Sequence, residues 1–394
     1  MNRFSKAMLA LAFTGAALVG VAGAENGVTD NSVLLGQSCA LNGPAEALGT
    51  GMQTGLTVAF GVANANGGVD GRTIELKSMN DSYEPDRCEK AVTALIEKAK
   101  VFMMIGGVGT PTAKAAVPVC EANEVPFVAP FTGAEFLRNP FKKYVVNLRA
   151  SYNQEMEALA AYLVDEQGLK NIACFYQNDG YGQAGLAGIT KALESRGMSL
   201  AGTGTYERNT VAVGQGLSDV AGTNPDAIIM VGAYKPCAEF IKQAKSNDAT
   251  KSAVFCNISF VGTKALTSEL GSLGEGVIIS QVVPFPWDTS IPVVKEFHNE
   301  MNKAGKSDQI GFVTLEGYLA GKFFVNALDN VEGTPSREAF LASVQNTGTF
   351  DLGGFVLEFG PDDHQGSDNV FLTWVNDGKL APLGNTSIAG VPIE

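Results

Sequence analysis

The chain has 394 residues, enough for two or three domains that each bury an apolar core. Acidic residues outnumber basic ones by 41 to 28, which gives a formal net charge of −13. This balance argues against a nucleic-acid partner, because the phosphates of nucleic acids require a basic surface.

The N-terminus has the pattern of a secretory signal peptide. Arg3 and Lys6 form a basic start, residues 7–21 are apolar, and the small residues of 22–24 provide a cleavage site. Residues 1–24 are therefore predicted to be removed, which leaves 26 of the 28 basic residues against all 41 acidic ones. No other apolar run reaches the roughly 18 residues of a membrane span, so we expect an exported protein that is not embedded in a membrane.

Six cysteines follow this segment, and none has the CxxC spacing of a metal site. Disulfides are common in exported proteins. The pairs Cys88–Cys120 and Cys237–Cys256 each connect neighbouring α/β elements, so they are the predicted bonds. Cys39 and Cys174 are then free buried thiols, although sequence alone leaves the connectivity open.

The first half of the chain alternates between strands and helices. Strands are expected at residues 32–36, 72–80, 101–105, 125–130 and 143–149, with helices at 53–66 and 87–100 and from 111 onward. The turn after residues 101–105 contains three glycines, and Thr110 is the predicted N-cap of the next helix, with Pro111 at its first position. Such a helix N-terminus presents unpaired N–H groups that attract carboxylates and phosphates.

The pattern then begins again. Ser151 and Gln154 form a predicted capping box before a helix at 155–167. Further strands are expected at 171–176, 227–231, 253–256 and 276–282, and further helices at 184–196, 237–245, 293–303 and 312–328, before a β-rich end. The alternation predicts an α/β protein with two lobes, each built on a doubly wound parallel sheet.

In open α/β sheets, ligands bind beyond the carboxyl ends of the strands. The polar residues predicted there are Ser38, Asn42, Thr110, Thr112, Thr132, Tyr152, Asn178, Asp179, Tyr181, Tyr234, Lys235, Asn257 and Ser259. Hydroxyls, amides and aromatic rings of this kind suit recognition better than catalysis.

Enzymatic function is not expected. The two histidines, His298 and His364, lie away from these strand ends and are predicted on the surface. The sequence contains no GxSxG, no HExxH and no phosphate loop with a lysine. We therefore predict no catalytic residues, no metal and no cofactor.

Seven segments together resemble one family. They are Gly43-Pro44, ANANGGVDGR at 63–72, DSYEP at 81–85, GGVGTPT at 106–112, VPFVAPFTGAEFLR at 125–138, YGQAG at 181–185 and GAYKP at 232–236. In order and spacing the chain resembles the type I periplasmic substrate-binding proteins of ABC transporters, in particular the branched-chain amino-acid-binding (Leu/Ile/Val) group.

The resemblance implies two Rossmann-like lobes that are joined by three hinge crossings and close on a ligand. The predicted lobes are residues 25–148 with 284–352, and residues 149–283 with 353–394. Thr110 and Thr132 would hold the ligand carboxylate, Tyr181 and Tyr234 would contact it from the second lobe, and Leu48 would cover it. The predicted ligand-binding set is completed by Ser38, Thr112, Tyr152, Lys235 and Ser259.

One position departs from the family. Where amino-acid binders have an acid that holds the ligand ammonium, this chain has Ser259, and Lys235 follows Tyr234 in place of a neutral residue. The expected ligand is therefore an organic acid, an amide or another amino-acid-like molecule. We expect the protein to be a periplasmic monomer that captures this ligand and delivers it to an ABC permease. The alternatives are a sensor of the same fold that reports to a receptor, or an exported hydrolase, for which no nucleophile–base pair is found.

Overall fold

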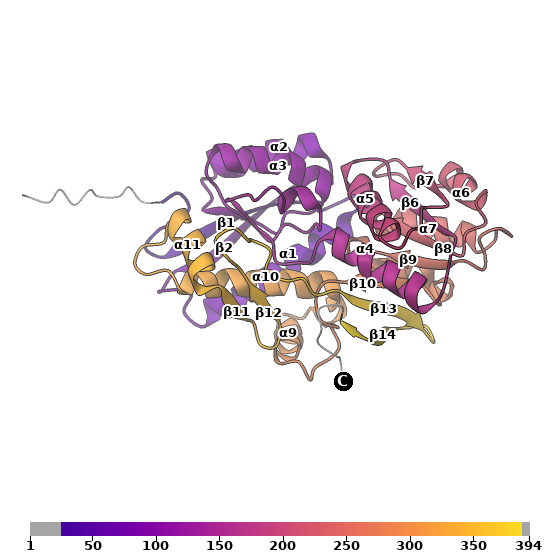
Figure 1. Ribbon diagram of the computed structural model, residues 1–394. Helices are drawn as coiled ribbons and strands as arrows, with labels where there is room; N and C mark the ends of the chain where they lie inside the picture. The colour runs from indigo at the N-terminus through magenta and orange to yellow at the C-terminus, as the bar shows by residue number, and fades with distance from the viewer. Residues whose placement is uncertain (1–24, 388–394) are drawn as a thin grey trace, which may run out of the picture.

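The computed structural model describes residues 25–387 and contains two large β-sheets in separate lobes, together with a two-stranded sheet (Figure 1). The predicted signal peptide, residues 1–24, lies outside the described residues. The first sheet is entirely parallel. Its strands, in spatial order, are β2 (Thr73–Asn80), β1 (Ser32–Cys39), β3 (Met103–Ile105), β4 (Phe127–Val128) and β5 (Val145–Val146).

Helices cover the first sheet, and together they form what we call the first lobe. These helices are α1 (Glu46–Ala65), α2 (Pro85–Thr93), α3 (Thr110–Ala122), α9 (Pro292–Lys303), α10 (Phe312–Asp329) and α11 (Arg337–Thr347). The long helix α10 was expected from its apolar run. It packs along α1, and glycines on both helices (Gly55 and Gly317) allow the two backbones to approach closely.

The second sheet is parallel except for its last two strands, which pair antiparallel. Its order is β14 (Lys379–Ser387), β13 (Phe371–Asn376), β10 (Ile278–Gln281), β9 (Val254–Asn257), β8 (Ala227–Val231), β6 (Ile172–Gln177) and β7 (Gly202–Tyr206). The helices of this second lobe are α4 (Tyr152–Ala160), α5 (Gly180–Glu194), α6 (Gly214–Ala221), α7 (Tyr234–Ala244) and α8 (Thr263–Leu270). Every residue of β8 is buried, as expected for a central parallel strand.

The chain passes between the lobes three times: after β5, after β10, and between the hairpin β11 (Thr349–Asp351)–β12 (Val356–Glu358) and β13. The C-terminal part, orange to yellow in Figure 1, therefore contributes to both lobes. The predicted α/β fold of two parallel-sheet lobes with three crossings is confirmed. The residue boundaries of the lobes stay a prediction, and Leu352, Phe355 and Leu357 of the hairpin pack into the core of the first lobe.

The predicted starts of helices α4 and α3 are confirmed, except that α3 begins one residue earlier. The capping box of Ser151 and Gln154 forms, and α4 begins at Tyr152. Helix α3 begins one residue earlier than predicted, because Gly109, not Thr110, is its N-cap. Gly109 has a φ of 104°, and a Cβ there would lie 2.2 Å from the Tyr83 ring, so only glycine fits this turn.

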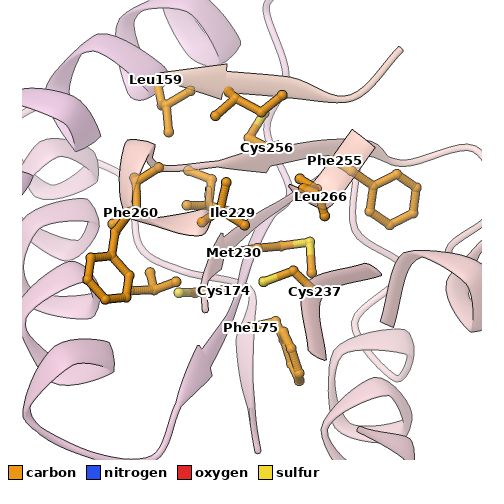
Figure 2. Packing of buried hydrophobic residues seen from close by; sticks show 14 of the residues in the cluster. Leu159, Cys174, Phe175, Ile229, Met230, Cys237, Phe255, Cys256, Phe260 and Leu266 are labelled. Carbon is orange, nitrogen blue, oxygen red and sulfur yellow. The ribbon is translucent and has the colours of Figure 1, made fainter. Parts of the chain in front are cut away.

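The predicted disulfides are not formed: all six cysteines are free and buried. The Cys88 thiol donates to the Thr112 carbonyl at 3.4 Å instead of meeting Cys120. Figure 2 shows Cys237 and Cys256 among the packed apolar side chains of this lobe, with Cys237 beside Met230. No helix within residues 25–387 is both long and apolar enough to cross a membrane.

Candidate functional site

Three hydroxyl groups meet at the edge of the first lobe that faces the second. The Thr110 and Thr132 hydroxyls are 2.6 Å apart, and Thr132 donates to the Tyr152 hydroxyl at 3.2 Å. All three residues are buried, and burial raises the pKa of Tyr152 to about 12, so its hydroxyl keeps its proton. Thr110 also opens α3, whose first-turn N–H groups have no partner within the helix. This corner can donate several hydrogen bonds to an anionic group.

Aromatic rings from both lobes pack beside the hydroxyls. Phe260 of the second lobe has ring centroids 5.5 Å from Phe131 and 5.9 Å from Tyr83, both in the first lobe. Tyr181 lies 4.5 Å from Phe260 and 5.5 Å from Tyr152. Because these side chains are all buried, the apolar core of the second lobe continues across the lobe boundary.

A buried ion cluster lies behind Phe131. The Arg149 guanidinium stacks over the Phe131 ring at 4.8 Å and donates through Nη2 to the Ser259 hydroxyl. Glu155, fully buried, accepts from the Ser259 N–H at 2.8 Å, the Ser259 hydroxyl at 2.9 Å and the Ser280 hydroxyl at 2.6 Å. Arg149 also lies 3.6 Å from Glu155. The acceptor sites of Glu155 are thus occupied by protein donors.

Two more acids near the lobe boundary, Asp81 and Asp179, are occupied in the same way. Asp81 accepts from the Ser38 hydroxyl at 2.7 Å and from the Tyr83 N–H at 2.8 Å, and burial raises its pKa. Asp179 caps α5 at the Tyr181 N–H and also accepts from Gln177 and Arg208. None of these carboxylates is free to bind a cation.

On one side of this cluster the lobes touch through the first turn of α1, which meets the starts of α7 and α8. The Tyr234 hydroxyl accepts from the Ala47 N–H at 3.4 Å, and Leu48 lies against Gly262. Next to this contact is a groove of about 480 Å³. It is lined by Leu48 and Gly51 of the first lobe, by Gly262 and Lys264 of the second, and by residues 308, 309 and 311–314.

A polar clasp joins the lobes elsewhere on the boundary. Arg208 of the second lobe donates to Glu84 of the first at 2.8 Å, and Asn209 donates to Glu84 at 2.7 Å and to the Ser82 carbonyl at 3.2 Å. Gln177 donates to the Tyr83 hydroxyl at 3.2 Å. Together with the aromatic packing, these bonds define a closed arrangement of the lobes.

The structure brings six of the predicted ligand-binding residues to the lobe boundary: Leu48, Thr110, Thr132, Tyr152, Tyr181 and Tyr234. Ser259 lies behind them in the ion cluster. Two residues turn away, because the Ser38 hydroxyl binds Asp81 and the Thr112 hydroxyl donates to the Val108 and Gly109 carbonyls. Lys235 is half-buried, with its Nζ 5.9 Å from the centre of the Tyr234 ring.

Two further positions differ from simple expectation. Within the described residues, both amide atoms of Asn257 lack a hydrogen-bond partner although the residue is buried. The surface prediction for His364 is wrong: it is buried, with Nδ1 3.1 Å from the Val145 carbonyl and Nε2 2.9 Å from Gln345. It thus fastens the last crossing to β5 of the first lobe.

Sequence reasoning missed Tyr83, Phe131, Arg149, Glu155 and Phe260. Two of these residues could have been predicted from the sequence, because Tyr83 belongs to the DSYEP segment and Phe131 immediately precedes Thr132. Arg149 closes a strand-like stretch, and nothing in its neighbourhood marks it as buried.

Fold and site together define a two-lobed binding protein whose candidate site lies between the lobes. The comparisons with known proteins agree. The family profile described as "Periplasmic binding protein" matches residues 32–379, and the chain belongs to this family.

Relatives of the Leu/Ile/Val group confirm the predicted resemblance. A possible leucine/isoleucine/valine-binding protein from Rhodopirellula baltica SH 1 has 36% identity and a TM-score of 0.86, over 90% of this chain and 97% of that one. Leu/Ile/Val-binding protein homolog 7 of Brucella abortus (strain 2308) is 24% identical, over 89% of this chain and 91% of its own. A solute-binding protein from R. palustris, solved in complex with benzoate, shares the fold at 19% identity, with a TM-score of 0.78 over 90% of this chain and 96% of that one.

Proposed function

We propose that this protein captures a small organic acid or amino-acid-like ligand in the periplasm by closure of its two lobes, and delivers it to an ABC permease. One observation carries the proposal. The hydroxyls of Thr110, Thr132 and Tyr152 and the N-terminus of α3 form a donor-rich corner directly beside aromatic rings that come from both lobes. A carboxylate would bind the corner, while an apolar body would pack against the rings and join the lobes.

Closure requires contacts that exist only when the lobes meet, because a ligand shifts an equilibrium only by its differential affinity for the two states. The clasp of Arg208 and Asn209, the Tyr234–Ala47 hydrogen bond and the rings around Phe260 are contacts of this kind. A ligand held by both lobes would add to them.

The ligand proposed here carries no α-ammonium group. An ammonium needs a free carboxylate or several carbonyl acceptors, and the oxygens of Asp81, Glu155 and Asp179 already accept from protein donors. Binding an ammonium at Glu155 would have to displace the Ser259 and Ser280 hydrogen bonds and compete with Arg149. Lys235, which forms no ion pair with the described residues, would favour an anion instead.

The test uses matched ligand pairs that differ by the ammonium alone. Calorimetric titration compares L-leucine with 4-methylpentanoate, and L-phenylalanine with 3-phenylpropanoate; native mass spectrometry of gently purified protein identifies any co-purifying ligand. We expect the acid without the ammonium to bind at least ten times more tightly in each pair, a difference of about 1.4 kcal/mol. Tight binding of leucine, isoleucine and valine would contradict the proposed ligand class.

Delivery to a permease is tested separately, because a sensor would close in the same way. The first step is to identify permease and ATPase genes next to the gene of this protein. Liganded protein should then stimulate ATP hydrolysis by that transporter, reconstituted in vesicles. Stimulation of a membrane receptor instead, with none of the transporter, would favour the sensor.

A further inference from the structure

A glycine of the second lobe faces a leucine of the first with no room between them. Gly262 precedes α8 in a left-handed conformation, with a φ of 80°. A Cβ built on it would lie 2.5 Å from Cδ2 of Leu48 and 3.8 Å from Cδ1 of Tyr234. Carbon atoms pack at about 3.5–4.0 Å, so a side chain at position 262 overlaps Leu48 in this arrangement of the lobes.

Leu48 has little freedom to move aside. It is fully buried, sits in the first turn of α1, and belongs to the apolar cluster that spans both lobes. Its neighbour Ala47 donates the hydrogen bond to Tyr234, so a shift of this turn would also break that bond. The contact therefore fixes how closely α1 and α8 approach.

The position of the pair connects it to ligand entry. Leu48 and Gly262 both line the groove of about 480 Å³, and Leu48 also packs in the buried cluster beside it. A separation of the lobes would have to open this contact.

We propose that the missing side chain at Gly262 sets the depth of lobe closure, by allowing Leu48 to seat across the cleft. The proposal rests on the closure mechanism of the proposed function, but not on the identity of the ligand. Any Cβ at position 262 would hold the lobes apart at α1 and α8 and leave the far contacts, including the clasp at Ser82 and Asn209, less often formed.

The test measures closure without a ligand. Ser82→Cys and Asn209→Cys place one thiol on each side of the clasp, where the Asn209 side chain reaches the Ser82 carbonyl at 3.2 Å. A short bismaleimide then crosslinks the lobes only when they close, and the six native cysteines are buried. Crosslinking rates are compared in otherwise wild-type protein and in protein with Gly262→Ala.

Two further variants distinguish the steric clash with Leu48 from the other effects of replacing a glycine by alanine. Gly276→Ala is the matched control: Gly276 is in the same lobe with a φ of 78°, and a Cβ there meets nothing within 4 Å. Leu48→Ala combined with Gly262→Ala removes the atoms that clash.

We expect Gly262→Ala to slow crosslinking about tenfold, within the range for overpacking a tight contact. Gly276→Ala should leave the rate within about twofold, and the double variant Leu48→Ala/Gly262→Ala should recover most of it. If Gly262→Ala fails to fold, Leu48→Phe enlarges the opposite side of the contact without straining the backbone and should slow crosslinking similarly. Equal rates for Gly262→Ala and Gly276→Ala, or no crosslinking in the parent protein, would overturn the proposal, whatever the ligand panel shows.

Discussion

Glu316 offers a direct test of the buried ion cluster at the crossings. Its carboxylate lies in α10 with a side chain 10% exposed, and Oε1 is 3.6 Å from Nε of Arg149, too far for a hydrogen bond. Burial raises its pKa from 4.5 to about 7, with a smaller rise from the charge of Glu155, while Arg149 and Arg138 oppose the rise. Glu316→Gln keeps the shape of the side chain and removes the titration.

The sign follows from proton binding. Between pH 4.5 and about 7 the folded protein holds a proton on Glu316 that the unfolded chain has released. The contribution of this group to stability is therefore fully present below pH 4.5 and is lost as the pH rises through 7. The gap between the two pKa values corresponds to at most about 3 kcal/mol, reached at about pH 8.

Urea unfolding from pH 5 to pH 8.5 measures this effect as the difference between wild type and Glu316→Gln. As the pH rises, the free energy of unfolding of the variant should increase relative to that of wild type by up to about 3 kcal/mol. Burial lowers the pKa of His364, which weakens stability at low pH, but His364 is present in both proteins and its contribution cancels. Parallel stability curves for the two proteins would show that Glu316 does not titrate in this range, and the account of the cluster would be wrong.

Two other substitutions follow from the geometry. Arg208→Ala removes a partly exposed inter-lobe ion pair with Glu84, so the crosslinking rate of the Ser82→Cys/Asn209→Cys protein should fall by less than about tenfold, and more at low salt than at high salt. The control Arg196→Ala breaks ion pairs within the second lobe only and should leave this rate unchanged. Equal effects of the two substitutions would refute an inter-lobe role for Arg208. Lys235→Ala should weaken binding of 4-methylpentanoate by on the order of 2 kcal/mol, while Lys242→Ala on the same helix should not; unchanged calorimetric affinity would remove Lys235 from the site.

Short-range signals in the sequence predicted most of the fold. The buried run ending at Ile105, the glycine turn and the start of α3 specify a strand, a turn and a helix from local chemistry alone. The capping box of Ser151 and Gln154 likewise depends on residues three apart, and it forms as predicted. The one-residue error at the start of α3 lies at Gly109, whose close approach to Tyr83, 26 residues earlier in the chain, no local pattern can reveal.

Contacts between distant segments were beyond the reach of local patterns. Tyr83, Phe131 and Phe260 come from three separate loops, and only the closed arrangement of the lobes places their rings together. Ser38 lies at the end of β1 and Thr112 in the first turn of α3, after β3, but their hydroxyls turn to acceptors within the first lobe. A residue's place at a strand end therefore predicts its neighbourhood better than the direction of its side chain.

The ammonium question shows why a single aligned position is a weak guide to ligand class. The sequence has Ser259 where an acid would stand in amino-acid binders, which suggests that the site lacks a carboxylate. The structure instead places Glu155 at hydrogen-bonding distance of Ser259, so a carboxylate is present but is supplied by α4. The Glu155 carboxylate already accepts three hydrogen bonds and lies beside the Arg149 charge. An incoming ammonium would have to displace these partners in a buried environment. The proposed preference for ligands without an ammonium therefore rests on the partners of Glu155, and it would be lost if Arg149 and Ser259 released that carboxylate.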